Sequence, residues 1–393
     1  MATKNLPVAE LKFGMYVASL DRPWTDTPFM FQGFVLETEE QLEILKKFCK
    51  SVFVDEARSE LRELAPLKPF TPRYKVQVPV EREVEKAKAA HRSTQATVRE
   101  MLQSVRVNRT LDTSSVEQAV TSMTESVLRN PDALLLFSRL REKGDYLHSH
   151  ALDTAVYMTS FGRFLELSVD QISLLGYVGL MQDVGKLRVP DEILKKRERL
   201  TVAEMEQARQ HVQHSIDILR ETRGLPPEVA ELAALHHERR DGSGYPKGLK
   251  GAEIGMIGCI AAIADVFDAL TGERPYANAV SPSTALSMLY KWRGTLFDAT
   301  LIEQFIRFVG IFPLGSVVEF NSGEIGIVIA QNLQKRLQPR VMIIRDPSGA
   351  ELKPQKLLDL SREPKTARGE AYRIKRTLEY GKAGINTDTL FLG

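Results

Sequence analysis

Histidine and aspartate residues recur through the middle of the sequence, each at or near the end of an otherwise apolar segment. In chain order they are His150, Asp183, His211, His236, His237 and Asp265. Neutral imidazoles and carboxylates that converge from separate helices build two-metal sites in helical bundles. Two ions about 3.5–4 Å apart can generate hydroxide at neutral pH and hold a phosphoryl group during its transfer. The pattern therefore predicts a metal centre suited to phosphoryl chemistry.

Some of these positions are hard to explain as ordinary core residues. Asp265 stands in IGCIAAIADVFDAL, where a carboxylate requires a cation, a metal ion or a hydrogen-bond network. His236 and His237 are adjacent on one apolar segment, so both imidazoles need partners there. His211 taken alone is explained equally well by a structural or a functional role. The remaining histidines are more simply interpreted as structural side chains: His91, His148 and His214.

Two short segments add to the pattern. In LMQDVGK an apolar helix end leads into Asp183, Gly185 and Lys186, which is typical of a corner that binds metal and phosphate. Gln182 precedes the aspartate at a position where histidine would be a better metal ligand. The loop ERRDGSGYPKGLKG at 238–251 can bring backbone amides close to a phosphate, although the same composition would also suit a simple turn.

The elements that must position these residues are helical. Residues from about 112 to 310 have the apolar spacing of a bundle of five or more helices. Ser114–Glu117, Ser168–Gln171 and Thr201–Glu204 each have the spacing of a capping box. Ser281–Pro282 predicts a further start, with proline at the first helical position.

The flanking segments have other patterns. GMYVASLD, FQGFVLE and SVFVD read as short strands and TEEQLEILKKFCK as a helix, whereas SVVEF, EIGIVI and RVMIIRD read as strands near the other end. We therefore predict a mainly α protein with a small mixed α/β N-terminal domain and a small β-rich C-terminal appendage. The expected segments are an N-terminal domain at 1–62, a proline-rich linker at 63–83, a connecting helix at 84–111, the helical domain at 112–312, the β appendage at 313–364 and a weakly ordered tail at 365–393.

Composition indicates the class of protein. The 393 residues are 43% hydrophobic and 26% charged, and the net charge of +2 gives no reason to expect nucleic acid or a membrane surface as partner. The longest apolar run, 257–264, is far shorter than the roughly 20 residues that cross a bilayer, so we expect no membrane span. Cys49 and Cys259 provide no disulfide framework. These features favour a cytoplasmic protein.

The motifs resemble those of the HD-GYP family, helical phosphohydrolases that degrade the bacterial messenger cyclic di-GMP. HHERRDGSGYP is close to the hallmark of that family, ADVFDALTGERPY is similar to a second specific stretch, and KKRERLTVAEMEQARQH fits the segment between its motifs. The resemblance covers roughly residues 130–320. Residues 6–56 also resemble a small uncharacterised domain that often precedes HD-GYP modules. The resemblance implies the fold of the helical HD superfamily for the middle of the chain.

The resemblance also implies two adjacent divalent ions, for which Fe, Mn, Ni and Zn are all suitable. The residues at the positions of the first ion's ligands are His150, Gln182, Asp183 and Asp265. Those at the second ion's ligand positions are Asp183, His211, His236 and His237. The residues at substrate-contacting positions are Lys186, Asp241, Gly244, Tyr245, Pro246 and Arg274. Asp183 and Lys186 would have the catalytic roles, one bridging the ions and the other balancing charge on the phosphoryl oxygens.

Three departures from the family pattern stand out. Gln182 replaces the histidine of the HD pair, and its neutral amide oxygen is a weaker ligand than imidazole, so the first ion should bind loosely. Tyr146 stands where members with a third metal have glutamate, which limits the expectation to one or two ions. Ala277 stands where a basic residue is common, so one phosphate contact is expected to be missing.

Two functions follow as hypotheses. The first is a cyclic di-GMP phosphodiesterase of weakened activity that yields linear pGpG, GMP or both. The second is a catalytically inactive cyclic di-GMP receptor or protein-interaction module that retains the loop and Arg274. Partners to consider are signalling proteins such as diguanylate cyclases and a second copy of the chain. The helix expected at 84–108 would either pair with its copy in a dimer or pack on the next domain. A scaffold that keeps only the fold is the weakest reading, since it gives no reason to keep the His/Asp set together.

Overall fold

The structure of the chain is a computed structural model. It describes residues 3–22, 27, 33–36, 39–56, 59, 73–107, 111–140, 146–196, 198–272, 279–333 and 335–378. The chain forms two compact units, Met1–Pro72 and Arg73–Gly393. The predicted fold class, a mainly helical core with small sheets toward both ends of the chain, is confirmed.

The N-terminal unit is a small antiparallel sheet with one helix. Its elements are β1 (Thr3–Pro7), η1 (Val8–Glu10), β2 (Tyr16–Leu20), β3 (Phe34–Val35), α1 (Glu39–Phe48) and β4 (Ser51–Asp55). The strand order is β1-β4-β2-β3, so the two ends of the segment pair with each other. Val17, Leu36, Leu45 and Val52 are fully buried between the sheet and α1. The sequence indicated every strand except β1, whose exposed polar residues hide its pairing with β4.

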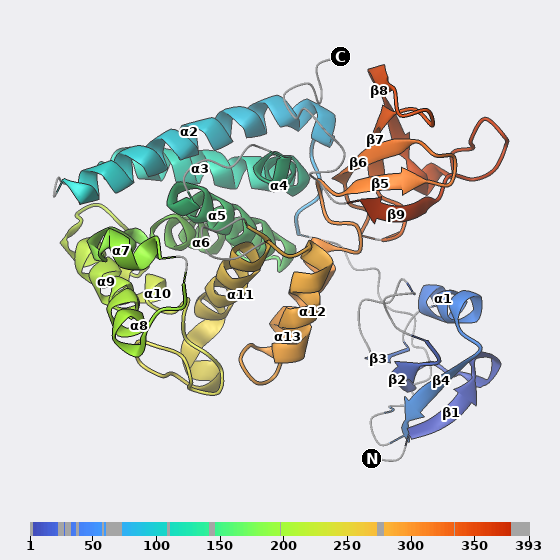
Figure 1. Cartoon of the computed structure of the whole chain (residues 1–393), viewed down its shortest axis with the longest axis horizontal. Coiled ribbons are helices and arrows are strands. Elements are labelled where there is room, and N and C mark those ends of the chain that lie inside the picture. The colour runs from blue at the N-terminus through green and yellow to red at the C-terminus, as the bar shows by residue number, and fades with distance from the viewer. Residues whose placement is uncertain are drawn as a thin grey trace. The chain divides into compact units, whose positions relative to one another are not determined.

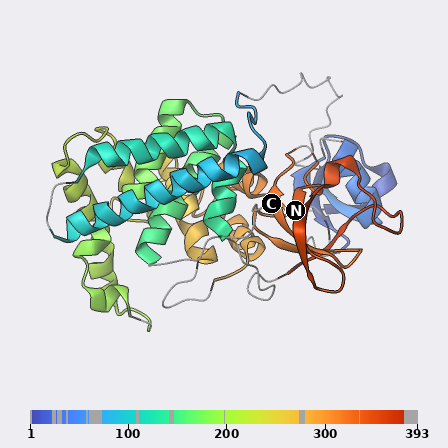
Figure 2. The same cartoon turned by 90° about the horizontal axis from the view of Figure 1, so that it is seen from above.

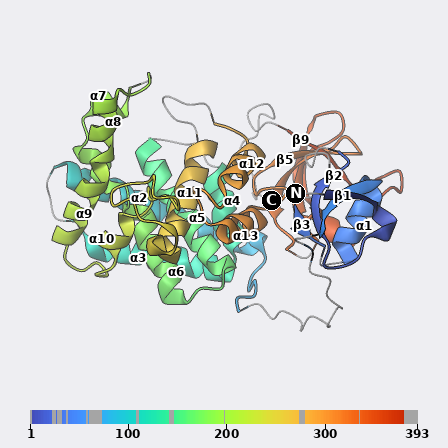
Figure 3. The same cartoon turned by 90° about the horizontal axis from the view of Figure 1, so that it is seen from below.

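The second unit begins with a bundle of helices (Figure 1). The helices are α2 (Val80–Arg106), α3 (Thr113–Arg129), α4 (Pro131–Leu140), α5 (Tyr146–Phe164), α6 (Val169–Met181), η4 (Val184–Arg188), α7 (Asp191–Leu194), α8 (Val202–Arg209), α9 (His211–Glu221), α10 (Val229–Ala233), η5 (Gly251–Ile254), α11 (Gly255–Thr271), α12 (Pro282–Trp292) and α13 (Ala299–Val309). Helix α5 lies at the centre and packs against α6 and α11. Figure 2 shows α2 running alongside α3, and Figure 3 shows α7 and α8 at the end of the bundle farthest from the C-terminal strands.

The helix starts follow the local sequence closely. Ser168 and Thr201 form the predicted capping boxes, and Ser281 caps α12 with proline at the first position. One start differs from the prediction. Asp112, not Ser114, caps α3, because its carboxylate accepts hydrogen bonds from the two amides that open the helix.

The long helix α2 also begins earlier than expected. It starts at Val80, four residues inside the segment assigned to the proline-rich linker. Pro79 stands at the N-cap, where the missing amide hydrogen is no loss because the first turn of a helix has free amides. Of the expected linker, residues 63–72 lie outside the described part of the chain.

The C-terminal part of the second unit is a five-stranded antiparallel sheet. Its strands are β5 (Val317–Phe320), β6 (Ile325–Ala330), β7 (Arg340–Arg345), β8 (Glu351–Asp359) and β9 (Ile374–Leu378), and η6 (Leu360–Arg362) follows β8. They are ordered β8-β7-β6-β5-β9. Strand β9 corrects the expected boundary at residue 364: the basic segment IKRTL pairs with β5, and Arg376 and Lys375 bind Glu319 there.

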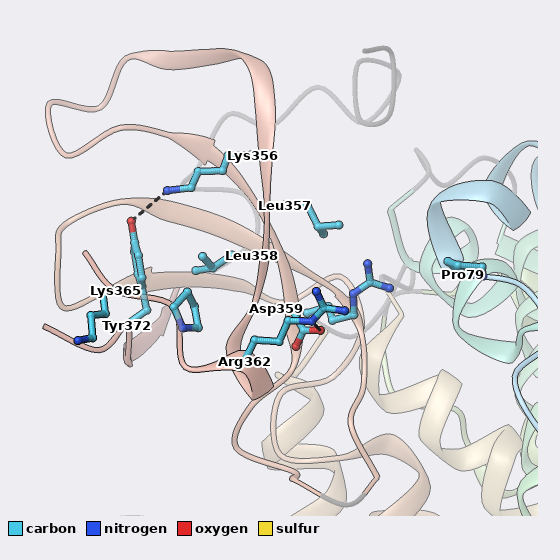
Figure 4. Close-up of a pocket in the computed structure, with 10 residues that line it drawn as sticks. Pro79, Lys356, Leu357, Leu358, Asp359, Arg362, Lys365 and Tyr372 are labelled. Atoms are coloured by element: carbon cyan, nitrogen blue, oxygen red, sulfur yellow. Dashed lines mark hydrogen bonds and ion pairs between the residues drawn. The ribbon is translucent and has the colours of Figure 1, made fainter. Parts of the chain in front are cut away.

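The sheet is tied to the helical bundle by polar contacts. Gln331 donates its backbone amide to Asp132 of α4, and Arg340 pairs with Glu81 of α2 at 2.6 Å. Arg340 also lines a cavity of about 620 Å³ on the sheet, in which Lys356 points toward the Tyr372 hydroxyl (Figure 4). These contacts hold the sheet at the start of α2.

One apolar stretch is longer than the sequence run suggested. By length and hydropathy alone, Gly251–Thr271 could cross a membrane, with a mean hydropathy of 1.8. In the structure 61% of its most apolar 18-residue segment is buried. Asp265 and Asp268 on this stretch face His150 of α5. The stretch therefore contributes to the core of the bundle.

Candidate metal centre

Five places in the bundle bring the predicted ligands together. His150 lies on α5, Asp183 on the corner between α6 and η4, and Asp265 on α11. His211 is the first residue of α9, and the His236-His237 pair follows α10. Their ligand atoms form two groups, each with all atoms within 4.8 Å of one another. The groups are Asp183, His211, His236 and His237, and His150, Asp183 and Asp265.

The first group surrounds the ring of His150. Its Nε2 lies 3.0 Å from Asp265 Oδ1 and 3.2 Å from Asp183 Oδ2. Gln182 is buried beside them: its side-chain nitrogen is 3.5 Å from Asp265, and its Oε1 has no hydrogen-bond partner among the described residues. Gln182 therefore lies beside the group around His150, with its side-chain nitrogen toward Asp265. Its role as a weak metal ligand stays a prediction.

In the second group the acceptor nitrogens of two histidines, His211 and His236, face each other. The Nδ1 atoms of His211 and His236 lie 2.6 and 2.7 Å from the carbonyls of Ala208 and Ala233. Because a carbonyl can only accept, those nitrogens carry the hydrogens, and in the neutral rings Nε2 has a lone pair. The two Nε2 atoms are 3.4 Å apart.

Asp183 stands between the two groups. Its Oδ1 is 3.4 and 3.5 Å from the Nε2 atoms of His211 and His236 and has no hydrogen-bond partner among the described residues. Its other oxygen faces His150 and Lys186. One carboxylate thus presents one oxygen to each group, which is the arrangement of a ligand that bridges two ions. The buried acceptors facing one another fit a divalent cation at each group.

Burial and charge keep the second group in its ligand form. Burial lowers the pKa of His211 to about 4, even though Asp183 opposes the shift. Burial, aided by His236, also places the pKa of His237 well below its ordinary value. Burial alone would raise the pKa of Asp183, but Lys186 and the neighbouring His150 and His236 hold it well below the usual range. Neutral imidazoles around an ionised carboxylate are the protonation states that bind metal.

A close approach of backbone to backbone explains how Asp183 and His211 meet. A Cβ on Gly185 would overlap the carbonyl oxygen of His211 and the amide of Ser215, so only glycine lets η4 pack this closely on α9. The Ser215 hydroxyl accepts from the Gly185 amide at 2.9 Å and donates to the Gln182 carbonyl at 2.8 Å. These two bonds fix the corner that carries Asp183.

The glycine-rich loop folds back over the histidine pair. Gly244 packs on the backbone of residues 237–239, where a Cβ would overlap the Arg239 amide. Tyr245 stacks on His237 with ring centroids 4.6 Å apart. Buried Glu238 accepts from the amides of Lys247 and Leu249 and so holds the far side of the loop. Tyr245 therefore forms part of the wall beside the second group.

Other predicted substrate residues have different surroundings. Lys186 lies against Asp183, with its Nζ 2.8 Å from Oδ2, and that carboxylate raises the pKa of the lysine against the effect of burial. Asp241 is exposed and accepts hydrogen bonds from Ser243, which is the role of a turn residue. Pro246 is exposed on the loop. Arg274 and Ala277 lie outside the described residues.

Asp268 is a functional candidate that the sequence reasoning missed. Its Oδ2 lies 2.7 Å from His150 Nδ1, so it orients that ring and leaves Nε2 free for a cation. The signal was present in ADVFDAL, because residues three apart lie on one face of a helix and Asp265 was already assigned. Asp268 contacts the ligand rather than the ion, so we describe it as a positioning residue.

Loss of Asp268 should weaken metal binding without removing a ligand. We expect Asp268→Ala to lower metal affinity about 10–100-fold, and Asp268→Asn to lower it less because an amide oxygen can still accept from His150. Titration of the metal-free protein with Mn²⁺ measures both variants. Asp153→Asn is the matched control, since Asp153 is a buried carboxylate of α5 held by Ser138. Equal losses in all three variants would contradict the role.

The fold and the site together define a class: a helical domain with a buried His/Asp cluster suited to divalent metal ions. Comparison with known families agrees, because residues 114–301 match the HD domain. Residues 3–116 match a domain of unknown function (DUF3391), and residues 317–367 match a KOW domain associated with the HD domain.

Individual relatives narrow the class. The chain is 32% identical over 376 residues to a cyclic di-GMP phosphodiesterase of Pseudomonas aeruginosa, covering 93% of this chain and 91% of that protein. It is 36% identical to a cyclic di-GMP phosphodiesterase response regulator of Xanthomonas campestris, over 49% of this chain and 52% of that protein. A 3′3′-cGAMP-specific phosphodiesterase of Vibrio cholerae is 35% identical, over 42% of this chain and 31% of that protein. The chain therefore belongs to the HD-domain family and is a homologue of the HD-GYP cyclic di-GMP phosphodiesterases.

Proposed function

We propose that this chain is a metal-dependent phosphodiesterase that hydrolyses cyclic di-GMP to linear pGpG, GMP or both in bacterial second-messenger signalling. The observation that carries the proposal is that the Nε2 atoms of His211 and His236 face Asp183 Oδ1, which has no hydrogen-bond partner among the described residues. The named activity of the P. aeruginosa relative, which aligns along nearly the whole chain, supplies the substrate.

The residues divide the work. Divalent ions bound at the two groups would act as Lewis acids on the phosphoryl oxygens. They would also lower the pKa of bound water so that hydroxide forms near neutral pH. Asp183 would hold both ions at once, because its two oxygens face different groups. Lys186 remains cationic beside Asp183 and would balance the negative charge that develops on the phosphoryl group. Tyr245, stacked on His237, would exclude water from one side.

Gln182 determines how the activity is expected to depend on metal concentration. A neutral amide oxygen is a poorer ligand than imidazole for first-row ions, so the group around His150 should bind its ion more weakly than the group around His236. The second group keeps a complete set of three histidines and a carboxylate. We therefore propose that activity rises with metal concentration until the weaker site fills.

The same residue favours a second candidate function. If the weaker ion is never held, the chain would bind cyclic di-GMP without cleaving it and act as a receptor. Signalling proteins such as diguanylate cyclases, or a second copy of the chain, would then be the partners that read the bound state. We propose a cytoplasmic location for either function.

Removal and return of metal tests the function. The purified chain is stripped with a chelator, reloaded with Mn²⁺, Fe²⁺, Ni²⁺ or Zn²⁺, and incubated with cyclic di-GMP while products are separated by chromatography. We expect no turnover in the stripped protein, and turnover that increases with added metal well beyond one ion per chain. The 3′3′ cyclic GMP-AMP dinucleotide serves as a competing substrate. Binding without turnover at every metal concentration would favour the receptor.

A further inference from the structure

A cavity of about 400 Å³ lies next to the candidate metal centre. Its walls come from the C-terminal end of α2, the start of α5, η4 and α7, and Figure 1 shows that end of α2 near α7. The volume is within the range of about 300–1,000 Å³ that small-molecule sites have.

The cavity shares a wall with the metal centre. Tyr146 lines the cavity and stacks on His150, with ring centroids 5.4 Å apart. Lys186 also lines the cavity, and its Nζ lies 2.8 Å from Asp183. A ligand whose phosphate lies at Asp183 and Lys186 would therefore extend directly into this space.

The lining suits one nucleotide. Four leucines provide apolar surface for a flat base: Leu102, Leu147, Leu187 and Leu194. Of the described lining residues Asp191 alone is acidic, and it is paired with Lys195 at 2.6 Å. Arg99 and Arg106 are exposed in the wall, and neither lies within ion-pair distance of a described acidic group, although Arg106 is close enough to Asp191 to help lower the pKa of that carboxyl. Seven positions apart, they lie on one face of α2 and present two guanidinium groups to an anion.

We propose that this cavity receives the second nucleotide of the cyclic dinucleotide, with its base among the leucines and its phosphate at Arg99 and Arg106. The inference rests on the proposed function and adds a specificity site to it. It also assigns a role to α2, which lies outside the match to the HD domain and inside the match to the domain of unknown function. The segment that matches the domain of unknown function would then contribute one wall of the substrate site through α2.

The test separates substrate binding from metal chemistry. In the full chain loaded with metal, we compare Arg99→Ala/Arg106→Ala with Lys86→Ala/Arg92→Ala, which removes the same charge from exposed positions of the same helix outside the cavity. We expect KM for cyclic di-GMP to rise about 10–100-fold in the first variant with little change in kcat, and no change in the second. Hydrolysis of bis(p-nitrophenyl) phosphate, which has no second nucleotide, should be unchanged in both.

The outcomes distinguish the two proposals. Equal KM values in the two double variants, or parallel losses on both substrates, would overturn the cavity assignment and leave the phosphodiesterase function standing. If the wild-type chain binds cyclic di-GMP without turnover, calorimetry replaces kinetics: a 10–100-fold weaker Kd in the arginine variant alone supports the assignment, and equal Kd values reject it. If the wild type neither binds nor cleaves the dinucleotide, the function fails and the cavity assignment falls with it.

Discussion

Substitution of Asp183 by asparagine should abolish turnover of cyclic di-GMP, with a loss of at least about 1,000-fold, or about 4 kcal/mol of transition-state stabilisation. Of the described residues, Asp183 is the one whose side chain belongs to both groups of candidate ligands. Asparagine keeps the shape of the side chain but replaces one oxygen by an amide nitrogen, so it can present an oxygen to only one ion. Measurement of metal per chain and of turnover under saturating Mn²⁺ tests the expectation.

The control for this substitution is Asp170→Asn, which removes the same charge from an exposed position in the first turn of α6. It should leave the metal content and turnover unchanged, with a small loss of stability from the helix dipole. Circular dichroism establishes that both variants are folded. Retention of two ions and near wild-type turnover in Asp183→Asn would contradict the bridging role.

Local features of the fold were readable from the sequence because they depend on residues a few positions apart. Ser168 and Thr201 indicate helix starts because each forms a capping box with the residue three positions later. Pro282 indicates a start because proline is favoured in the first turn of a helix. Strands β1, β8 and β9 were missed. Most residues of β8 are exposed, so it lacks the apolar alternation of a core strand. Strands β1 and β9 are polar and are stabilised by pairing with strands more than 40 residues away.

The residues of the candidate site also include some that the sequence predicted and some that only the structure revealed. The His/Asp pattern identified His150, Asp183, His211, the His236-His237 pair and Asp265, and the resemblance to a family assigned them to two ions. The structure brings their ligand atoms together in two groups. Asp268 could have been found from its spacing to Asp265 on one helix face, but its role depends on a 2.7 Å contact with His150, 118 residues away. The position of α2 beside the site depends on tertiary packing that no local pattern encodes.

Helix α4 links the C-terminal sheet to the helical core. Helix α4 contacts the C-terminal sheet through Asp132 at its start and reaches the core behind the metal centre through Arg139, which donates to Thr271 of α11. Asp132 is half-buried, and the loss of solvent around its carboxyl raises the pKa of that group to about 6. Helix α4 therefore contacts both the C-terminal sheet and α11, the helix that carries Asp265.

Replacement of Gln182 by histidine should increase both metal content and activity. The side chain is buried at the end of α6, beside Asp265 and with its oxygen unpartnered among described residues, so an imidazole there would add a strong nitrogen ligand to the group around His150. We expect metal per chain to rise toward two and turnover at limiting metal to rise about 10–100-fold, a gain comparable to the loss that follows removal of a supporting contact at a metal site.

Gln182→Leu is the matched control for the histidine variant, because it keeps a side chain of similar size without any ligand atom. We expect it to hold fewer ions than the wild type and to need more metal for the same turnover, which would show that the glutamine oxygen contributes. Elemental analysis and activity as a function of Mn²⁺ concentration measure all three proteins. An unchanged metal content in Gln182→His would show that this position does not face an ion. Full metal loading of that variant with nucleotide binding but no turnover would instead identify the chain as a receptor whose catalytic defect lies beyond the missing histidine.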